Sequence, residues 1–174
     1  LNEYKKVFNG IAVDISAEEA KEIEKLPGVK SVSPNFKLEL DLMDSVPLIN
    51  ADDVWSLDSA GNNCVESGEE CLTGEGITIG IIDTGVDYTH GDLGGCFGNG
   101  CKVIGGYDFV NNDNDPMDDH GHGTHVAATA AGNGILKGVA PDAKMYAYKV
   151  LDNNGWGSWA NVIADIERSV DTNQ

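Results

Sequence analysis

Three histidines lie close together in the stretch DDHGHGTHVAATAAG, residues 118–132. Imidazoles this close could bind a metal ion together, or one could act as a catalytic base while the others take no part. His122 stands just before a run of small residues that predicts a helix over 124–131. The positive end of a helix opposes protonation, so His122 would be a neutral imidazole able to accept a proton. His125 falls inside the helix and His120 follows two acids, so we expect packing for the first and solvent contact for the second.

Asp83 is the acid whose position best suits a partner for His122. It follows the apolar run 77–82, which is typical of a parallel strand buried on both faces. Open parallel sheets place functional groups at the carboxyl ends of their strands. A carboxylate there could fix the tautomer of His122 and stabilise the imidazolium formed during a reaction. The alternative is that Asp83 only begins an Asx-turn into Thr84 and Gly85.

Strands and helices alternate in the second part of the chain. Apolar runs predict strands over residues 77–82, 102–104 and 143–151. Ser158 is a helix cap, and the residues after it that share one apolar face are Trp159, Val162, Ile163, Ile166 and Val170. This order predicts an α/β domain with a mostly parallel sheet flanked by helices.

The first 40 residues predict a smaller α+β unit. Its expected elements are a hairpin over 4–15 turning at Asn9-Gly10, a helix begun by the capping box 16–19 and ended by Pro27-Gly28, and strands over 29–32 and 36–40. Residues 41–75 are acidic and rich in turns, with one short helix expected within 48–57.

Composition narrows the class of function. The chain has 174 residues, enough for one domain with a small additional unit. Asp and Glu number 29 against 11 Lys and Arg, a formal net charge of −18, which argues against nucleic acid as a partner. No apolar run is long enough to cross a bilayer. The chain starts at Leu1 and ends at Gln174 directly after a helical pattern, so we expect both ends to be truncated.

Four cysteines occur in two close pairs, Cys64 with Cys71 and Cys96 with Cys101. Four cysteines allow three connectivities, of which local pairing is the simplest. Such disulfides would imply an oxidising compartment and would stabilise the fold by roughly 2 kcal/mol each through loop closure. A zinc site is the competing interpretation, but neither pair has the short spacing of a zinc knuckle.

Two blocks of sequence resemble the subtilisin-like serine proteases. One reads GIIDTGVDYTHGDL, residues 80–93, and the other reads HGHGTHVAATAAG, residues 120–132, followed by GVAPDAKMYAYKVL. Subtilisins carry their catalytic residues in the order Asp, His, Ser. The resemblance implies that Asp83 is the acid and His122 the base of such a triad. Gly91 and Ala128 are mild departures, since the family often has Pro and Gly there.

Residues 1–41 are similar to the second half of the family's inhibitor-type propeptide, through VFNGIAVDIS and EEAKEIEKLPGVKSVSPN. Residues 42–174 resemble the N-terminal part of its catalytic domain. The resemblance implies a partial ferredoxin-like α+β propeptide that chaperones and inhibits the enzyme, followed by the first part of a subtilisin-like parallel sheet. Cleavage is expected within about residues 38–45, and residues 36–40 would lie in the substrate cleft like a product.

The family's nucleophile is the largest departure. The chain has nine serines, none in a G-T-S-M-A-like context, and Ser158 is better explained as a helix cap. The resemblance places the nucleophile and the oxyanion-hole Asn beyond residue 174. Without the nucleophile there is no acyl-enzyme chemistry, so residues 1–174 alone are expected to be inactive.

The short acidic loop YDFVNNDNDPMDD could bind calcium. Several oxygen ligands in a flexible loop suit Ca²⁺, although the spacing does not match an EF-hand. The loop also resembles a calcium loop ahead of the catalytic His in thermostable members of the family. The candidate ligands are Asp108, Asn111, Asp113, Asp115 and the Met117 carbonyl. The alternative is a plain acidic turn. A second family site would use Asp92, but its partner loop at 132–137 looks shortened.

Residues 151–157, LDNNGWG, resemble the edge strand that pairs with a substrate backbone. An unpaired edge can add a peptide strand through main-chain hydrogen bonds. Leu151 begins the segment, Gly155 and Gly157 leave room for substrate side chains, and Trp156 could wall an apolar pocket. The alternative is a glycine turn before a helix.

These features predict a secreted or cell-surface serine endopeptidase of subtilisin type, stabilised by calcium, acting on polypeptides and inhibited by its own propeptide. Two alternatives stay open. One is a zinc hydrolase that uses His120, His122 and His125, although the spacing lacks the Glu of H-E-x-x-H. The other is a non-catalytic calcium-binding or protease-inhibiting module.

Overall fold

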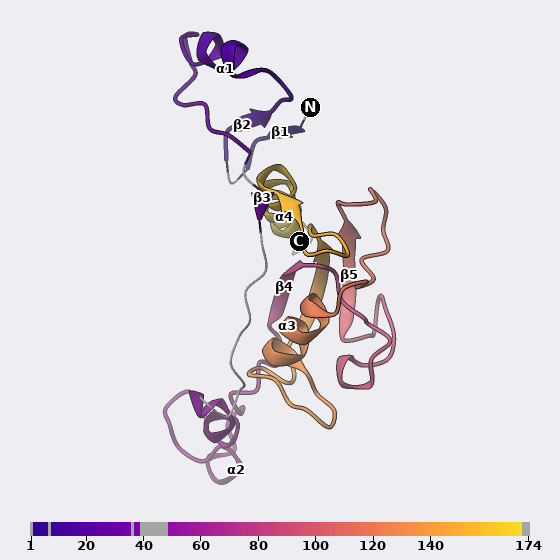
Figure 1. The fold of residues 1–174 in the computed structure, drawn as a ribbon. Helices are drawn as coiled ribbons and strands as arrows, with labels where there is room; N and C mark the ends of the chain where they lie inside the picture. The colour runs from indigo at the N-terminus through magenta and orange to yellow at the C-terminus, as the bar shows by residue number, and fades with distance from the viewer. Residues whose placement is uncertain (1, 7, 36, 39–48, 172–174) are drawn as a thin grey trace.

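A three-stranded parallel sheet forms the centre of the structure (Figure 1). The computed structural model describes all residues except 1, 7, 36, 39–48 and 172–174. The strands are β4 (Thr78–Asp83), β5 (Val103–Asp108) and β6 (Lys144–Lys149), in the order β4-β6-β5. Lys149 is in register with both Asp83 and Asp108, so all three strands end at the same edge. The predicted parallel α/β sheet is confirmed.

Small side chains let helix α3 (His122–Ala131) approach this sheet closely. Ala127 and Ala131 have no exposed surface and belong to the same apolar cluster as Ile81 and Met145. The helix contacts β4 and β6. It begins two residues before the predicted start, so its first turn includes His122.

Strand β5 extends four residues beyond its predicted end at residue 104. Gly105 and Gly106 interrupt the apolar pattern that marks a strand, so the second half of β5 has no signal in the sequence. Their lack of a side chain has a packing reason, since a Cβ at Gly106 would lie 1.9 Å from the carbonyl oxygen of Ala147. A Cβ at Gly105 would lie 2.6 Å from the ring of Tyr146. Glycine therefore allows β5 to lie against β6.

The N-terminal unit contains the expected hairpin and helix with different bounds. Strands β1 (Asn2–Tyr4) and β2 (Gly10–Ala12) pair antiparallel, with Tyr4 opposite Gly10, so Gly10 belongs to a strand and not to a two-residue turn. Helix α1 (Ala17–Ile23) has the predicted capping box, in which Ser16 and Glu19 bind each other's backbone amides. The helix ends at Ile23, before Pro27, and residues 24–25 already form a turn.

Two predicted strands after α1 are wrong or differently placed. Residues 29–32 form no strand. Within 36–40 the structure describes only β3 (Lys37–Leu38), which pairs antiparallel with β7 (Gly157–Ser158). The rest of that prediction and most of the expected cleavage region, 38–45, lie outside the described residues.

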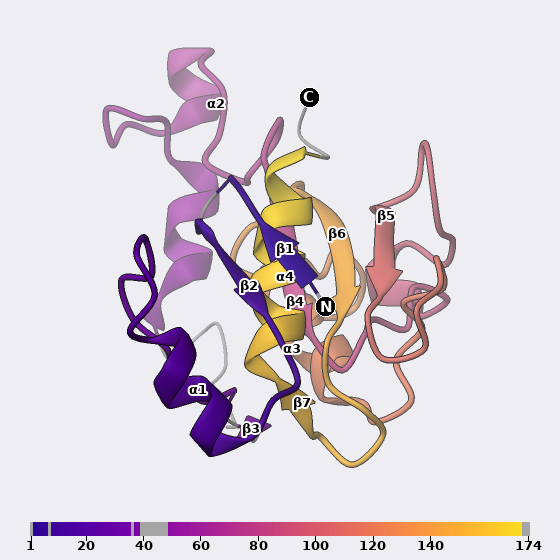
Figure 2. The same cartoon turned by 90° about the horizontal axis from the view of Figure 1, so that it is seen from above.

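The N-terminal unit lies against helix α4 (Trp159–Asp171), as Figure 2 shows for β1 and β2. The Tyr4 hydroxyl donates to the carbonyl of Ala160 at 2.8 Å, and Tyr4 is only 3% exposed. The Lys6 amide donates to Glu167 at 2.9 Å. At the start of α4 the Ser158 hydroxyl accepts the Asn161 amide, which confirms the predicted cap.

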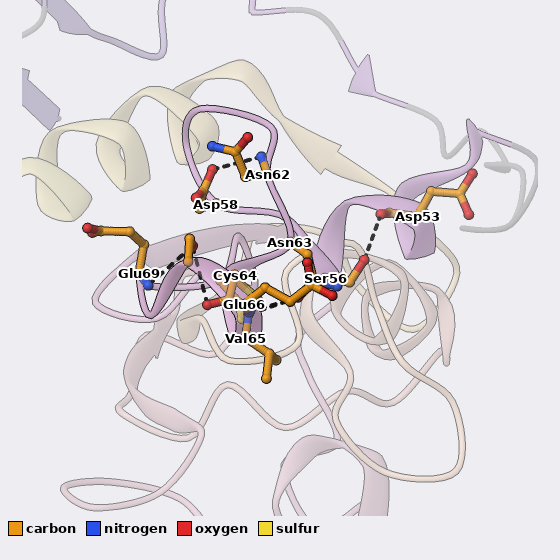
Figure 3. Close-up of a disulfide and its surroundings, with 11 residues drawn as sticks. Asp53, Ser56, Asp58, Asn62, Asn63, Cys64, Val65, Glu66 and Glu69 are labelled. Carbon is orange, nitrogen blue, oxygen red and sulfur yellow. Dashed lines mark hydrogen bonds between the residues drawn. A yellow bond between two sulfur atoms is a disulfide. The ribbon is translucent and has the colours of Figure 1, made fainter.

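A disulfide-linked segment occupies the end of the molecule opposite α1 (Figure 1). It contains the 3₁₀ helix η2 (Ala51–Ser56), within the predicted range, and the short helix α2 (Cys64–Ser67), which the sequence did not predict. Figure 3 shows how local polar contacts shape it: Asn63 accepts the amides of Val65 and Glu66, and Asp58 accepts the amide of Asn62. Such caps satisfy amides at the start of a helix.

Both cysteine pairs are local in the structure. Cys64 bonds to Cys71 with a Cα–Cα distance of 5.2 Å, and Cys96 bonds to Cys101 at 5.6 Å. Each bond closes a loop of a few residues. None of the described helices has the length and apolarity needed to cross a membrane.

Asp165 is a buried carboxyl group of α4 that lacks hydrogen-bond partners in the described structure. Its side chain has no exposed surface, and neither oxygen meets a donor. Burial raises the pKa of Asp165 from 3.8 to about 8, and Arg168 lowers it by less. The folded state therefore favours the protonated acid. Asp165 does not lower the stability of the folded state through ionisation below about pH 4. The loss of stability grows as the pH rises and is complete above about pH 8.

We therefore expect Asp165→Ala to stabilise the full-length protein by roughly 1–3 kcal/mol at pH 8 and much less at pH 4.5. Urea unfolding at the two pH values measures the effect. The exposed Asp53→Ala serves as the control and should change stability equally at both. Destabilisation by Asp165→Ala at pH 8 would contradict this account, since it would show that the carboxylate has a favourable partner.

Candidate active site

The side chains of Asp83 and His122 face each other where β4 ends and α3 begins. Nδ1 of His122 lies 2.9 Å from Oδ1 and 3.0 Å from Oδ2 of Asp83. The two side chains are 10% and 9% exposed, so little water competes for the contact. Because a carboxylate only accepts, Nδ1 carries the proton in this contact, and a neutral His122 then presents the lone pair of Nε2. This is the arrangement of a general base held by an acid.

An Asx-turn at Asp83 would use the amide two residues further on, that of Gly85, but the amide that its carboxylate accepts is the adjacent one of Thr84. Oδ1 of Asp83 also accepts the amide of Thr84 at 2.7 Å. The contact fixes the carboxylate group of Asp83 while both of its oxygens lie near His122. Asp83 therefore accepts the Thr84 amide and contacts His122 at the same time.

Glycines allow the two segments that carry this pair to come into backbone contact. A Cβ at Gly123 would lie 2.0 Å from the carbonyl oxygen of Gly85 and 3.1 Å from Cβ of Asp83. Gly85 itself has φ +105°, which a side chain rarely adopts. The first turn of α3 thus packs directly on the loop after β4.

Thr84 and Asp118 take part in this junction, although the sequence analysis did not single them out. The Thr84 hydroxyl donates to Asp118 at 2.8 Å and accepts the Gly123 amide at 2.9 Å. Burial favours the neutral form of Asp118, but hydrogen bonds from Thr124, Gly121 and His120 outweigh it and lower the pKa of Asp118. The signal in the sequence was an acid four residues before His122.

Lys149 is a third residue at this junction that the sequence pattern did not single out. It is 1% exposed, and its ammonium donates to the carbonyls of Thr84 at 2.7 Å and Leu151 at 3.2 Å and pairs with Asp119. These acceptors satisfy a buried charge that would otherwise be costly. Lys149 therefore joins the loop after Asp83 to the segment that begins at Leu151. A lysine inside an apolar strand was the available signal.

The other two histidines do not join His122 in a metal site. His120 and His125 are both exposed, and Nδ1 of His120 accepts the His122 amide at 3.4 Å. In the part of the chain that the structure describes, no three His, Cys, Asp or Glu side chains are grouped to hold a metal ion. The zinc-hydrolase interpretation therefore has no ligand cluster to support it.

The predicted substrate edge is a tight turn followed by a short strand. The Asp152 amide donates to the Trp156 carbonyl at 2.8 Å, and Gly155 adopts φ +77° in the turn between them. Leu151 and Gly157 then form an isolated antiparallel bridge. Only Gly157 belongs to β7, whose partner is β3. The strand pairing of this segment with β3 thus involves residues 157–158, the glycine turn covers most of the predicted segment, and a substrate contact here stays a prediction.

The acidic loop before α3 brings the candidate calcium ligands near one another without forming a metal cluster. Asp108 is 1% exposed, and its carboxylate accepts the amides of Val110 and Asn111 and the side chain of Asn111. The Asp108 and Asp113 backbones hydrogen-bond across the loop, and Asp113 accepts the Asp115 amide. The oxygen donors suit Ca²⁺, but these carboxylates already have protein partners, so binding would require some of them to reorient.

Asp115 and Met117 make further contacts in this loop. The Tyr88 hydroxyl donates to Asp115 at 2.7 Å, and this hydrogen bond raises the pKa of Tyr88 to about 12. The Met117 carbonyl packs against the backbone of Gly85, 2.8 Å from where a Cβ would stand. The loop is therefore attached to the segment after Asp83.

Asp92 binds the shortened loop directly. Its carboxylate accepts the amides of Ile135 at 2.7 Å and Leu136 at 3.3 Å, and its carbonyl accepts the amide of Asn133. These amides occupy the oxygens that a second calcium site would use. That a second calcium site at Asp92 is weak stays a prediction.

Comparisons with known proteins place these residues in a family. The sequence pattern of the subtilase family matches residues 74–174, and that of peptidase inhibitor I9 matches residues 1–41. A solved structure of a cold-adapted subtilisin-like serine proteinase aligns with a TM-score of 0.50 and 37% identity, covering 57% of this chain and 34% of the other. The match at 74–174 contains both Asp83 and His122.

Curated relatives are similar along most of the chain but are much longer. The minor extracellular protease Vpr of Bacillus subtilis is 41% identical over 97% of this chain, which spans 22% of Vpr. The alkaline serine exoprotease A of Vibrio alginolyticus is 33% identical over 92% of this chain and 29% of its own length. Thermitase of Thermoactinomyces vulgaris is 46% identical over 56% of this chain and 34% of its own. The chain belongs to the subtilase family.

Proposed function

We propose that Asp83 and His122 supply the acid and base of a serine endopeptidase that hydrolyses peptide bonds in polypeptides. The observation that carries the proposal is the buried contact between Asp83 and His122 within the region matched to the subtilase family. Two of these relatives are named as proteases, Vpr and the alkaline serine exoprotease A, and the name of the second includes serine.

The residues have distinct roles in this proposal. Nε2 of His122 takes the proton from a serine hydroxyl supplied from outside these 174 residues, and that serine attacks the peptide carbonyl. Asp83 accepts from Nδ1, keeps the reactive tautomer and stabilises the imidazolium. His122 then returns the proton to the leaving amine, and water hydrolyses the acyl-enzyme by the same proton path.

A serine-directed phosphonate tests this function. In the full-length protein we expect it to label one serine covalently and to abolish cleavage of a fluorogenic peptide, while a zinc chelator leaves the activity unchanged. Activity lost to the chelator but not to the phosphonate would instead support a zinc hydrolase. Absence of both labelling and cleavage would support a non-catalytic module.

Residues 1–41 are proposed to act as an inhibitory propeptide of residues 42–174. The match to peptidase inhibitor I9 and the pairing of β3 with β7 support this role. The Tyr4 hydroxyl makes one of the hydrogen bonds that hold the unit on α4. One such bond contributes about 1 kcal/mol, so we expect Tyr4→Phe to weaken inhibition about fivefold and to speed the onset of activity.

Time courses of peptide cleavage by freshly purified full-length precursor measure this effect. The exposed Lys30→Ala should match the wild-type time course. An unchanged onset in Tyr4→Phe would argue that contact with α4 does not maintain inhibition.

Calcium binding by residues 108–117 is a further part of the proposal, supported by the oxygen donors of Asp108, Asn111, Asp113, Asp115 and the Met117 carbonyl. Calcium at about 100 times its dissociation constant is expected to stabilise the full-length protein by about 2.7 kcal/mol, or roughly 5–10 °C in Tm. Asp113→Asn should remove most of this shift, whereas the exposed Asp14→Asn should keep it. Equal calcium shifts in both variants would place the ion elsewhere.

An extracellular or cell-surface location is proposed as well. The two local disulfides require an oxidising compartment to persist, and Vpr is named as an extracellular protease.

A further inference from the structure

The carboxylate of Asp118 receives five hydrogen bonds at the junction between β4 and α3. Oδ1 accepts from the Thr84 hydroxyl at 2.8 Å and from the amides of His120 and Gly121, each at 2.9 Å. Oδ2 accepts the amide of Thr124 at 2.9 Å and its hydroxyl at 2.5 Å. One side chain therefore contacts both the loop that follows Asp83 and the helix that carries His122.

The charge of Asp118 determines the direction of two hydroxyl groups. A carboxylate can only accept, so the hydroxyls of Thr84 and Thr124 must both donate to it. Their lone pairs are then left to accept backbone amides. Thr84 accepts the amide of Gly123, and Thr124 accepts the amide of Asp87.

The two hydrogen bonds that these amides donate connect β4 and α3 in opposite directions. Thr84 follows Asp83 and binds the residue after His122, while Thr124 lies in the first turn of α3 and binds the loop after Asp83. The N-cap of α3 is Gly121, which has no side chain to cap the helix. Asp118 binds the Gly121 and Thr124 amides in its place. Asp118 thus links the start of α3 to the end of β4.

We propose that Asp118, acting through Thr84 and Thr124, is a positioning residue that sets the separation and orientation of Asp83 and His122. It does not contact the reacting atoms. The inference rests on the proposed peptidase function, because it concerns the geometry of that site. A displacement of about 1 Å in such a site can cost about 100-fold in rate.

Asp118→Asn in the full-length protein tests the role of the carboxylate at nearly constant volume. Its amide nitrogen donates, so it cannot receive all the bonds that the carboxylate receives. Active sites are counted with the serine-directed phosphonate, and kcat is expressed per titrated site. We expect kcat to fall roughly 10- to 100-fold with KM changed less than about twofold. The exposed Asp52→Asn carries the same charge change and should keep the wild-type kcat.

Two variants of Thr84 separate the effect of its hydroxyl hydrogen bonds from the effect of its side-chain volume. Thr84→Ser keeps the hydroxyl and should retain kcat within about threefold, whereas Thr84→Val keeps the shape, loses the hydroxyl and should fall as far as Asp118→Asn. In the double variant Asp118→Asn with Thr84→Val, the loss should be close to that of Asp118→Asn alone, since Asp118→Asn already disturbs the link through Thr84.

The possible outcomes test the positioning role of Asp118 separately from the proposed peptidase function. A wild-type kcat per titrated site in Asp118→Asn, or equal kcat in Thr84→Ser and Thr84→Val, would overturn the positioning role while the peptidase function stands. If Asp118→Asn yields no titratable sites because it does not fold, the Thr84 pair alone decides. A wild-type protein that neither binds phosphonate nor cleaves peptide would instead remove the proposed function.

Discussion

His122→Ala is expected to lower kcat of the full-length protein by about 10⁶-fold, and Asp83→Asn by about 10⁴-fold, magnitudes known from other Ser-His-Asp triads. Loss of the imidazole removes the proton acceptor for the serine. In Asp83→Asn the amide can donate to Nδ1, which favours the tautomer with its proton on Nε2, where it cannot act as a base. Peptide cleavage by each variant, with substrate both below and above KM, measures these losses.

His125→Ala is the matched control, because His125 lies one turn further along α3 and is exposed. It should retain the wild-type kcat. A double variant with both Asp83→Asn and His122→Ala should be about as inactive as His122→Ala alone, since the acid acts only through the imidazole. Substantial activity in His122→Ala, or equal losses in His125→Ala, would rule out His122 as the general base.

Gly123→Ala is expected to have the second largest effect. The added Cβ would start 2.0 Å from the carbonyl oxygen of Gly85, and a backbone atom cannot move aside as a flexible side chain can. The first turn of α3 must therefore shift away from β4. We expect destabilisation by roughly 2–4 kcal/mol and a fall in kcat of about 100-fold per titrated site, because the same shift separates His122 from Asp83.

Gly91→Ala provides the control for adding a methyl group. Apart from its own local chain, no atom lies within 4 Å of its Cβ position, and Gly91 does not adopt a positive φ. Its stability should stay within about 0.5 kcal/mol of wild type. Urea unfolding and phosphonate titration measure both variants. A fully active and stable Gly123→Ala would mean that α3 and β4 are not in close backbone contact.

The sequence predicted well the elements that have a regular pattern and a clear boundary. The buried run before Asp83 located β4, and small residues after His122 located α3, so their meeting followed from the general rule for strand ends. The comparisons confirm the family that the two motifs indicated. Strand β5 is longer than its predicted range because Gly105 and Gly106 give no apolar signal, and the strand predicted over 29–32 is absent from the structure.

The polar network around the pair could not be predicted from the sequence. Its members lie far apart in the sequence and form no recognisable motif: Thr84, Asp118 and Lys149. Their roles depend on which atoms the fold brings within hydrogen-bond distance. A carboxylate one position away, Asp119, binds Lys149 and not the threonines. Periodicity cannot distinguish these two neighbouring acids, because the difference arises from the course of the loop.

The pairing of β3 with β7 means that one hydrogen-bonding edge already has an occupant from the same chain. A covalently attached strand has a local concentration on the order of millimolar, which does not change when the solution is diluted. If substrates bind at this edge, a peptide from solution must compete with β3, which is covalently attached and cannot diffuse away. Dilution of the intact chain would then leave the edge occupied by β3. Only cleavage of the chain between β3 and the rest of the protein would let β3 dissociate and give substrates access.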